Sequence, residues 1–176
     1  MKKRFSVVIV HRNGADMLLN TLSALTRAWD ATRDELFLVD NASTDDSLER
    51  VDAAFPQAII IRNRCNNGFA RANNQAIARA TGEFILLLNS DAVVAADVLD
   101  RFEADFRRDP RIGVITGQLQ DAAGGLQRSC GSAPTVLNEL GLGFLKKNPV
   151  SIAHDGLIDT ETVVGACLVV RAAAIQ

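Results

Sequence analysis

The hydrophobic residues of this chain fall into short apolar runs separated by segments with helical spacing. The run 84–88 is apolar at all five positions and leads into Asn89-Ser90-Asp91. A short run without alternation is typical of a strand buried on both faces of a parallel sheet. Asp91 would then lie at a strand end, where ligands bind, although the triplet could equally cap the next helix. Similar runs predict strands over 5–10, 35–39, 58–61 and 113–116.

Helical periodicity is clearest after the first of these runs. Leu18, Leu22, Leu25 and Trp29 follow one another at spacings of four, three and four. These spacings place all four side chains on one face of an amphipathic helix. The sequence therefore predicts a helix that extends to about Trp29 and packs its apolar face on the sheet.

Capping residues delimit the other predicted helices. Residues Asn41 to Thr44 offer side-chain caps for a helix that extends to about Phe55. The alanine-rich stretch 69–80 predicts a helix that Gly82 ends in a left-handed conformation, and another helix is expected over 96–107. Strands and helices that alternate in this way predict an α/β fold with a mostly parallel central sheet flanked by helices and right-handed crossovers.

The pattern changes after Gly117. The turn-forming residues 121–125 predict a hairpin with arms over 118–120 and 126–129. The stretch 133–150 is expected to form short helices or a mobile flap. Two further strands and the start of a helix are expected near the end of the chain, over 160–164, 167–170 and 172–176.

Composition limits the classes of function. A chain of 176 residues with 48% hydrophobic residues can form one domain with a sizeable core. The net charge of -2 gives no argument for nucleic acid as a partner. No apolar stretch is long enough to span a bilayer, and the basic start lacks a signal-peptide cleavage site. The three scattered cysteines fit a reducing cytosol better than a disulfide framework, so a cytoplasmic location is expected.

Polar residues follow four of the predicted strands. They are His11 to Asn13, Asp40 with Asn41, Asn66 to Gly68, and Asn89 to Asp91. Because parallel strands end at the same edge of a sheet, these residues are expected to form one site for a polar ligand. Each group also has a local interpretation, as a turn, a helix cap or a source of positive φ angles.

These residues resemble motifs of the inverting family 2 glycosyltransferases. The similar segments are 7–10, 39–45, 67–74 and 87–91, and the resemblance continues through 114–117, 127–130, 134–135 and 165–171. It covers nearly the whole chain in the family's order. The family has the GT-A fold, a Rossmann-like sandwich, and uses nucleotide-diphosphate sugars. The variant with Asp-Asn-Ala-Ser-Thr and Gly-Ala-Cys looks most like a bacterial rhamnosyltransferase-like branch, which mostly builds cell-surface polysaccharide.

The resemblance implies roles for particular residues. Asp40 is similar to the acid that contacts the nucleotide base, and a carboxylate can accept a hydrogen bond from a pyrimidine N–H. Asp91 matches the last acid of an Asp-x-Asp-like motif that holds Mg²⁺ or Mn²⁺ on the diphosphate. Asn89 stands where many relatives carry the first acid. The implied donor site comprises Val10, His11, Asn13, Asp40, Asn41, Asn67, Asn74, Ser90, Asp91, Gly165 and Ala166.

The resemblance also implies the partners and a division of the chain. Residues 1–117 would bind the nucleotide sugar, with a uridine or thymidine diphosphate donor, and residues 118–176 would begin the acceptor-side half of the same domain. The acceptor would be a saccharide or a lipid-linked saccharide. The pair Lys146-Lys147 could contact such an acceptor or the inner face of a membrane, which would make the association with the membrane peripheral.

Two departures from the family pattern affect the expected activity. His11-Arg12-Asn13 replaces a motif that often carries an aromatic residue, so Arg12 could stack on the base, pair with phosphate or remain solvated. The family's catalytic base lies in a Glu-Asp-type motif beyond the Gly-Ala-Cys segment, and this chain ends before one. We therefore expect a truncated chain and assign no catalytic residue.

Three alternatives to a transferase follow from the sequence. The first is a nucleotide-binding fragment or degenerate paralogue without transferase activity. The second is a flavodoxin-like signalling domain, because acids at strand ends also occur in phosphoacceptor receivers; it leaves the motifs above unexplained. The third, a dinucleotide-binding enzyme, is disfavoured because no Gly-x-Gly-x-x-Gly follows the first strand.

Overall fold

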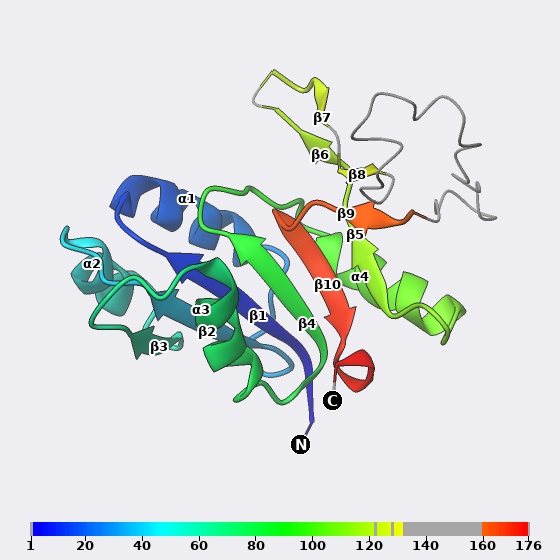
Figure 1. Ribbon diagram of the computed structural model, residues 1–176, viewed down its shortest axis with the longest axis horizontal. Coiled ribbons are helices and arrows are strands. Elements are labelled where there is room, and N and C mark those ends of the chain that lie inside the picture. Colours follow the sequence, from blue (N-terminus) through cyan, green and yellow to red (C-terminus); the bar gives the residue numbers. More distant parts are fainter. Residues whose placement is uncertain (1, 122, 128, 132–159, 176) are drawn as a thin grey trace, which may run out of the picture. The chain divides into compact units, whose positions relative to one another are not determined.

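A six-stranded sheet forms the core of the larger of two compact units in the chain (Figure 1). The computed structural model describes residues 2–121, 123–127, 129–131 and 160–175. The larger unit comprises Met1–Ile115 and Gly165–Gln176, and the smaller comprises Thr116–Val164. None of the helices in the described residues is long and apolar enough to cross a membrane.

The sheet is mostly parallel, as predicted. Its strand order is β3-β2-β1-β4-β10-β5, in which β1, β2, β3 and β4 run parallel and β10 runs antiparallel to β4. The strands are β1 (Lys3–His11), β2 (Glu35–Asp40), β3 (Ile59–Arg62), β4 (Gly82–Asn89), β10 (Cys167–Arg171) and β5 (Val114–Thr116). The chain moves outward from β1 through β2 and β3 and then returns to the other side of β1 as β4. The strand order therefore reverses between β1 and β4.

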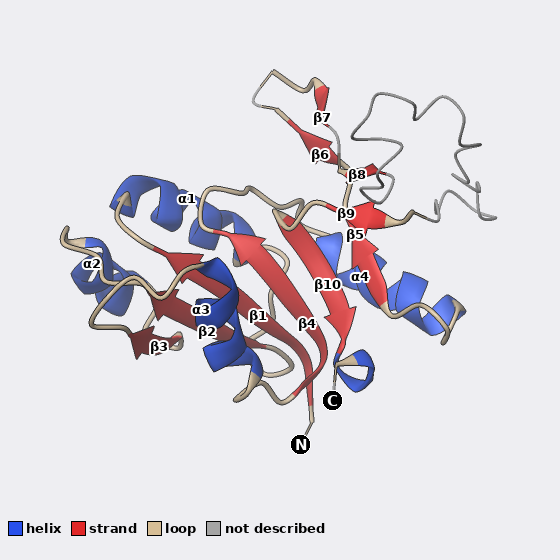
Figure 2. Ribbon diagram, viewed as in Figure 1, coloured by secondary structure: helices blue, strands red, loops and turns tan. Residues whose placement is uncertain are grey.

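Helices cover both faces of this sheet. They are α1 (Ala15–Leu25), α2 (Ser47–Ala54), α3 (Phe69–Ile77) and α4 (Val98–Arg108). In Figures 1 and 2, α3 lies in front of the sheet and the other three lie behind it. Ala72 and Ala76 of α3 pack on Val8, Phe37 and Val39, all buried. Small side chains on the helix allow close approach to the branched and aromatic residues of the strands.

The other face of the sheet is held by aromatic packing. Phe84 of β4 lies between Phe5 of β1 and Phe106 of α4, with ring centroids 5.3 Å and 4.5 Å apart. Because strand side chains alternate between faces, Val7 and Ile9 point the same way as Phe5 and are fully buried. Both faces of β1 are thus apolar, which explains why its sequence lacks polar alternation.

Three predicted helix boundaries are wrong. The first helix, α1, ends at Leu25, so Trp29 lies beyond it, with its backbone N–H bonded to the Leu25 carbonyl at 3.0 Å. The residues Asn41 to Thr44 do not cap α2, which begins at Ser47; the Ser47 N–H is instead accepted by Asp45 Oδ1 at 3.2 Å.

Gly82 is also not the left-handed cap that was predicted. It is the first residue of β4, beside β1, and a Cβ atom at this position would lie 2.5 Å from the Ser6 backbone nitrogen. Glycine is needed here because two strand backbones approach closely, a requirement set by tertiary packing that the local sequence does not reveal.

The residues after Gly117 form short strands. The predicted hairpin is present as β6 (Leu119–Gln120) and β7 (Leu126–Gln127), and β8 (Cys130–Gly131) pairs with β9 (Thr162–Val163). The strand predicted over 167–170 is β10 of the large sheet, followed by the short 3-10 helix η3 (Ala172–Ala174). The predicted flap, 133–150, and Lys146-Lys147 lie outside the described residues.

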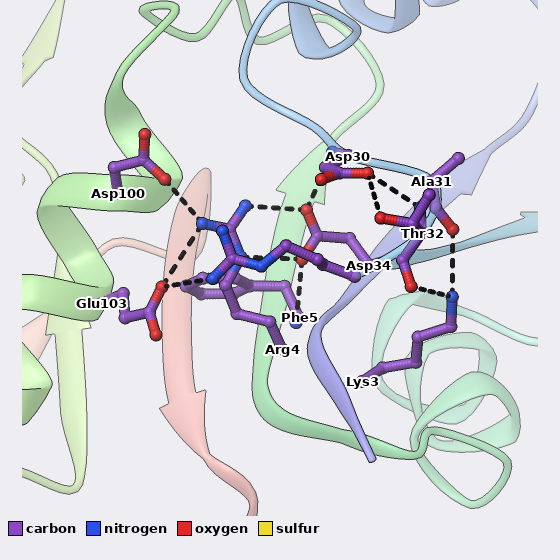
Figure 3. A network of polar contacts seen from close by, with 10 residues as sticks. Lys3, Arg4, Phe5, Asp30, Ala31, Thr32, Asp34, Asp100 and Glu103 are labelled. Carbon is purple, nitrogen blue, oxygen red and sulfur yellow. Dashed lines mark hydrogen bonds and ion pairs between the residues drawn. The ribbon is translucent and has the colours of Figure 1, made fainter. Parts of the chain in front are cut away.

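A buried ion pair joins the start of β1 to the loop before β2 (Figure 3). Arg4 donates from Nε and Nη2 to Asp34 at 2.9 and 2.8 Å, and the exposed fractions of the two side chains are 6% and 0%. Asp34 also accepts the Phe5 backbone N–H at 3.2 Å. Arg4 reaches Asp100 and Glu103 of α4 at 2.6 and 3.4 Å, so a single guanidinium links three elements. The hydrogen bonds that Arg4 donates to Asp34 are the main reason that the pKa of Arg4 is raised.

We predict that Asp34→Asn destabilises the fold, because it leaves the buried Arg4 charge without its main counter-ion. The expected loss is about 3 kcal/mol of unfolding free energy, measured by urea denaturation. The matched control is Asp100→Asn, since the Asp100 side chain is 73% exposed; this change should cost less than about 1 kcal/mol. Equal losses in the two variants would contradict the prediction.

Candidate functional site at the strand ends

The strand register brings the predicted site residues to one edge of the sheet. Val10 of β1 pairs with Val39 on one side and with Asn89 on the other, and the next residue, His11, pairs with Asp40. The row continues into β10, because the Asn89 N–H donates to the Ala166 carbonyl at 3.0 Å. This edge lies at the carboxyl ends of the parallel strands and includes the point of reversed strand order, where open α/β sheets bind ligands.

The loops after β1 and β2 are clamped together. Asn13 adopts a positive φ of 58°; its Oδ1 accepts the Thr44 N–H at 2.8 Å, and its own N–H donates to Ser43 Oγ at 3.0 Å. Asp45 accepts the Gly14 N–H at 2.7 Å and also bonds the Ser47 hydroxyl. Asn13 therefore acts in the structure as a loop tie, whatever further contact it makes with a ligand.

Asp45 owes its low pKa to this clamp. The hydrogen bond from Ser47, with help from the Gly14 N–H, lowers the pKa of Asp45 to about 2. Asp45 was not among the predicted site residues. The sequence predicts that residues 41–44 cap the helix that follows them, whereas Asp45 joins two loops that only the fold brings together.

Asp40 lies at the base of the site. The residue is 4% exposed, and its Oδ1 accepts the Ser43 backbone N–H at 3.0 Å. The Ala42 backbone between them has a positive φ of 68°, which turns the loop back over the carboxylate. The hydrogen bond from Ser43 orients the Asp40 carboxylate. The pairing of β1 with β2 places Asp40 next to His11.

His11 is buried next to this carboxylate. It is 2% exposed, and neither ring nitrogen has a hydrogen-bond partner within the described part of the chain. Burial lowers the pKa of His11, while the charges of Asp45 and Asp40 act in the opposite direction. The imidazole is therefore a buried group at this edge of the sheet, next to Asp40 in the strand register.

Asn41 joins the end of β2 to the β3–α3 loop. It is 4% exposed; its Oδ1 accepts the Asn67 N–H at 2.9 Å, and its Nδ2 donates to Asn66 Oδ1 at 2.7 Å. Asn66 in turn accepts the Gly68 N–H at 2.9 Å. The proposed site residues included Asn67 but not Asn66, although an Asn two residues before Gly is a recognisable sign of an Asx turn.

The polar triplet lies at the end of β4, with Asn89 and Ser90 half-buried. Asp91 is exposed, and the Ser90 carbonyl accepts the Thr21 hydroxyl of α1 at 3.0 Å, which fixes the loop. No group of three His, Cys, Asp or Glu residues able to hold a metal occurs among the described residues. One exposed carboxylate beside amide and hydroxyl oxygens nevertheless suits Mg²⁺ or Mn²⁺, which commonly takes one or two carboxylates plus substrate phosphates.

The remaining predicted residues lie around this edge. Gly165 and Ala166 are half-buried just before β10, and Ala166 contacts Asn89 through the backbone bond described above. Asn74 is exposed in the second turn of α3. No contact within the described ranges ties the Asn74 side chain to the strand ends, so its place in the site rests on the sequence alone.

The fold is that of an α/β protein with polar residues gathered at the carboxyl ends of its parallel strands. The family model of Glycosyl transferase family 2 matches residues 6–158. The chain belongs to this family.

Known relatives agree with this assignment. A poly(ribitol-phosphate) beta-glucosyltransferase of Bacillus spizizenii is 29% identical over 126 residues, which are 69% of this chain and 20% of that protein. Staphylococcus aureus TarS 1-349 in complex with UDP has a TM-score of 0.72 at 20% identity, covering 98% of this chain and 48% of that one. A Pyrobaculum calidifontis mannosyltransferase in complex with GDP-Man and Mn²⁺ has a TM-score of 0.66 at 20% identity, covering 97% and 45%. The structural matches confirm the GT-A fold, and the chain spans less than half the length of each of these relatives.

We predict that the loop clamp weakens in acid. Because the pKa of Asp45 is depressed in the folded state, its contribution to stability is full above the unfolded pKa of about 4 and is lost as the pH falls toward about 2. Unfolding free energies of the wild type and Asp45→Asn, measured between pH 5 and 2, should therefore converge as the pH falls. Asp46→Asn is the control, since Asp46 is the next residue and forms only a long ion pair with Arg50, at 3.9 Å. A constant difference between wild type and Asp45→Asn would refute the prediction.

Proposed function

We propose that this chain forms the donor-binding part of a glycosyltransferase that moves a sugar from a nucleotide diphosphate to a saccharide or lipid-linked acceptor, with inversion, in cell-surface polysaccharide synthesis. The observation that carries the proposal is that Asp40 ends β2 on one side of β1, while Asn89, two residues before Asp91, ends β4 on the other side. Rhamnose is the sugar that the sequence motifs favour. We place the enzyme in the cytoplasm, peripherally at the inner face of the membrane.

The relatives support this proposal through what their names state. One is a beta-glucosyltransferase that acts on poly(ribitol-phosphate), and two solved neighbours hold UDP and GDP-Man, the latter with Mn²⁺. A uridine or thymidine diphosphate sugar is the donor that we propose here. The site would be lined by the eleven residues named from the sequence, with Asp40 toward the base and Asp91 toward the diphosphate.

Asp40 would recognise the base by hydrogen bonding. Its Oδ1 is engaged by the Ser43 N–H, and the carboxylate can accept a further bond at Oδ2. A ring N–H of uracil or thymine is a suitable donor. Because Asp40 is buried, such a bond would be shielded from water and therefore specific.

Asp91, with oxygens of Asn89 and Ser90 nearby in sequence, would hold the divalent ion against the diphosphate. The ion supplies charge stabilisation for the departing nucleotide diphosphate. Asn89 in place of an acid leaves the protein with one negative charge fewer, so phosphate oxygens must provide much of the coordination. We therefore expect metal and nucleotide to bind together rather than separately.

Transfer itself needs a base at the acceptor. A carboxylate would remove the proton of the acceptor hydroxyl as its oxygen attacks the anomeric carbon and the nucleotide diphosphate leaves from the opposite face. General-base catalysis typically contributes roughly a hundredfold to ten-thousandfold in rate. We assign this role to no described residue, and donor binding is therefore the property to test first.

We predict metal-dependent nucleotide binding that requires Asp91. Calorimetric titration of the wild type with uridine, thymidine and guanosine diphosphates, each with and without Mn²⁺, should give a binding isotherm for one base only when metal is present. Asp91→Asn should abolish the metal-dependent part. Asp97→Asn is the matched control, because Asp97 is exposed in the same loop and bonds Arg101. Retained metal-dependent affinity in Asp91→Asn would refute the metal assignment.

We also predict discrimination against cytidine diphosphate. Cytosine presents a lone pair where uracil presents its ring N–H, so it would face the Asp40 carboxylate acceptor to acceptor. The expected penalty is at least about tenfold in affinity, the effect of one unsatisfied buried hydrogen bond. Asp40→Asn should bind uridine diphosphate more weakly and reduce the ratio between the two nucleotides. An unchanged ratio would show that Asp40 does not contact the base.

A further inference from the structure

Four carboxamide side chains form a continuous hydrogen-bonded chain beneath the β3–α3 loop. Gln75 and Asn63 bond reciprocally, with Asn63 Nδ2 donating to Gln75 Oε1 at 2.9 Å and Gln75 Nε2 donating to Asn63 Oδ1 at 3.0 Å. Asn63 Nδ2 also lies 3.3 Å from Asn41 Oδ1, and Asn41 Nδ2 donates to Asn66 at 2.7 Å. We call Asn41, Asn63, Asn66 and Gln75 the amide network.

Two backbone N–H groups fix the polarity of the whole network. The Asn67 N–H needs an acceptor, so the oxygen of the Asn41 amide, not its nitrogen, must face it. In the same way, the Gly68 N–H requires the oxygen of the Asn66 amide. With Asn41 so oriented, its Nδ2 faces Asn66 and its Oδ1 faces Asn63 Nδ2. The reciprocal pair then determines Gln75. Each amide therefore has one orientation that satisfies its neighbours. A carboxylate in place of Asn63 would oppose two acceptors, Asn41 Oδ1 and Gln75 Oε1, and one in place of Gln75 would oppose Asn63 Oδ1.

The network connects the end of β2, where Asp40 lies, to the loop that carries Asn67. The Asn63 backbone N–H donates to the Asp40 carbonyl at 2.9 Å, so the start of the loop is pinned to β2. Gln75 is part of α3, the helix that follows the loop. Its hydrogen bonds to Asn63 therefore join this helix to the start of the loop. The segment 63–68 is thus tied at both ends and in the middle by groups that carry no net charge.

We propose that Asn63 and Gln75 are positioning residues for the nucleotide, acting through Asn41 and Asn66 to hold the Asn67–Gly68 backbone in its binding conformation before the donor arrives. This inference rests on the proposed function. A loop ordered in advance does not lose conformational freedom on binding, so the network raises donor affinity without touching the donor. Loss of one donor within the network should loosen the loop and leave the core of the sheet intact.

The first test uses the isosteric change Asn63→Asp and needs no ligand. It replaces the Nδ2 donor by oxygen, so that Asn41 and Gln75 each face an acceptor. We expect the backbone amides of Asn67 and Gly68 to exchange with solvent at least about tenfold faster in hydrogen-exchange NMR, while amides of β1 keep the wild-type rate. Asn20→Asp makes the same chemical change at an exposed site of α1 and should alter neither. Unchanged exchange at Asn67 and Gly68 would overturn the network's positioning role.

The second test measures affinity for uridine diphosphate with Mn²⁺. We expect Asn63→Asp and Gln75→Glu each to weaken binding by about tenfold. The double variant Asn63→Gln with Gln75→Asn keeps both amides and their combined length, and we expect its affinity to be close to that of the wild type. Faster exchange with unchanged affinity would overturn the inference while leaving the proposed function intact. A wild-type chain that binds none of the nucleotides would overturn the proposed function and, with it, the role in donor binding.

Discussion

The pairing of β1 with β2 on one side and β4 on the other determines where every polar group of the site lies. Side chains alternate along a strand, so a shift of one residue would turn Asp40 to the opposite face of the sheet. The register is held by residues buried on both faces, such as Val8 toward α3 and Phe5 toward α4. Apolar packing in the middle of the strands thus fixes polar chemistry at their ends.

The two ends of this sheet are stabilised by different kinds of polar interaction. At the amino-terminal end, full charges are buried: Arg4 and Asp34 are almost inaccessible and neutralise one another. At the carboxyl end, the loops are held mainly by amides, hydroxyls and backbone N–H groups around Asn13 and Asn41. The amides in these ties carry no charge, and the Asp45 carboxylate that joins two of the loops bonds a backbone N–H and a hydroxyl rather than a cation. A salt bridge there would compete with a diphosphate and its metal ion.

Much of the fold could be predicted from the sequence because its signals are local. Unbroken apolar runs such as 84–88 identified the central strands, and polar residues directly after them identified the edge that carries the site. Errors occurred where a long-range contact decides the conformation. Gly82 lies against the Ser6 backbone of a neighbouring strand, and α1 ends four residues before Trp29, although the apolar spacing continues. The contact at Gly82 is not encoded within a few residues of that position.

The candidate site shows the same division at finer scale. Asp40, Asn41 and Asp91 were predicted because each follows an apolar strand. Asn66 was predicted at the same edge but was not included in the donor site, and Asp45 was not predicted at all. Their importance comes from hydrogen bonds to groups brought near by folding. Residues that are expected to touch a ligand are thus visible as polar positions after strands. Residues that hold them in place look like ordinary loop amides and acids until the hydrogen bonds are known, so such positioning residues are the ones that sequence analysis tends to miss.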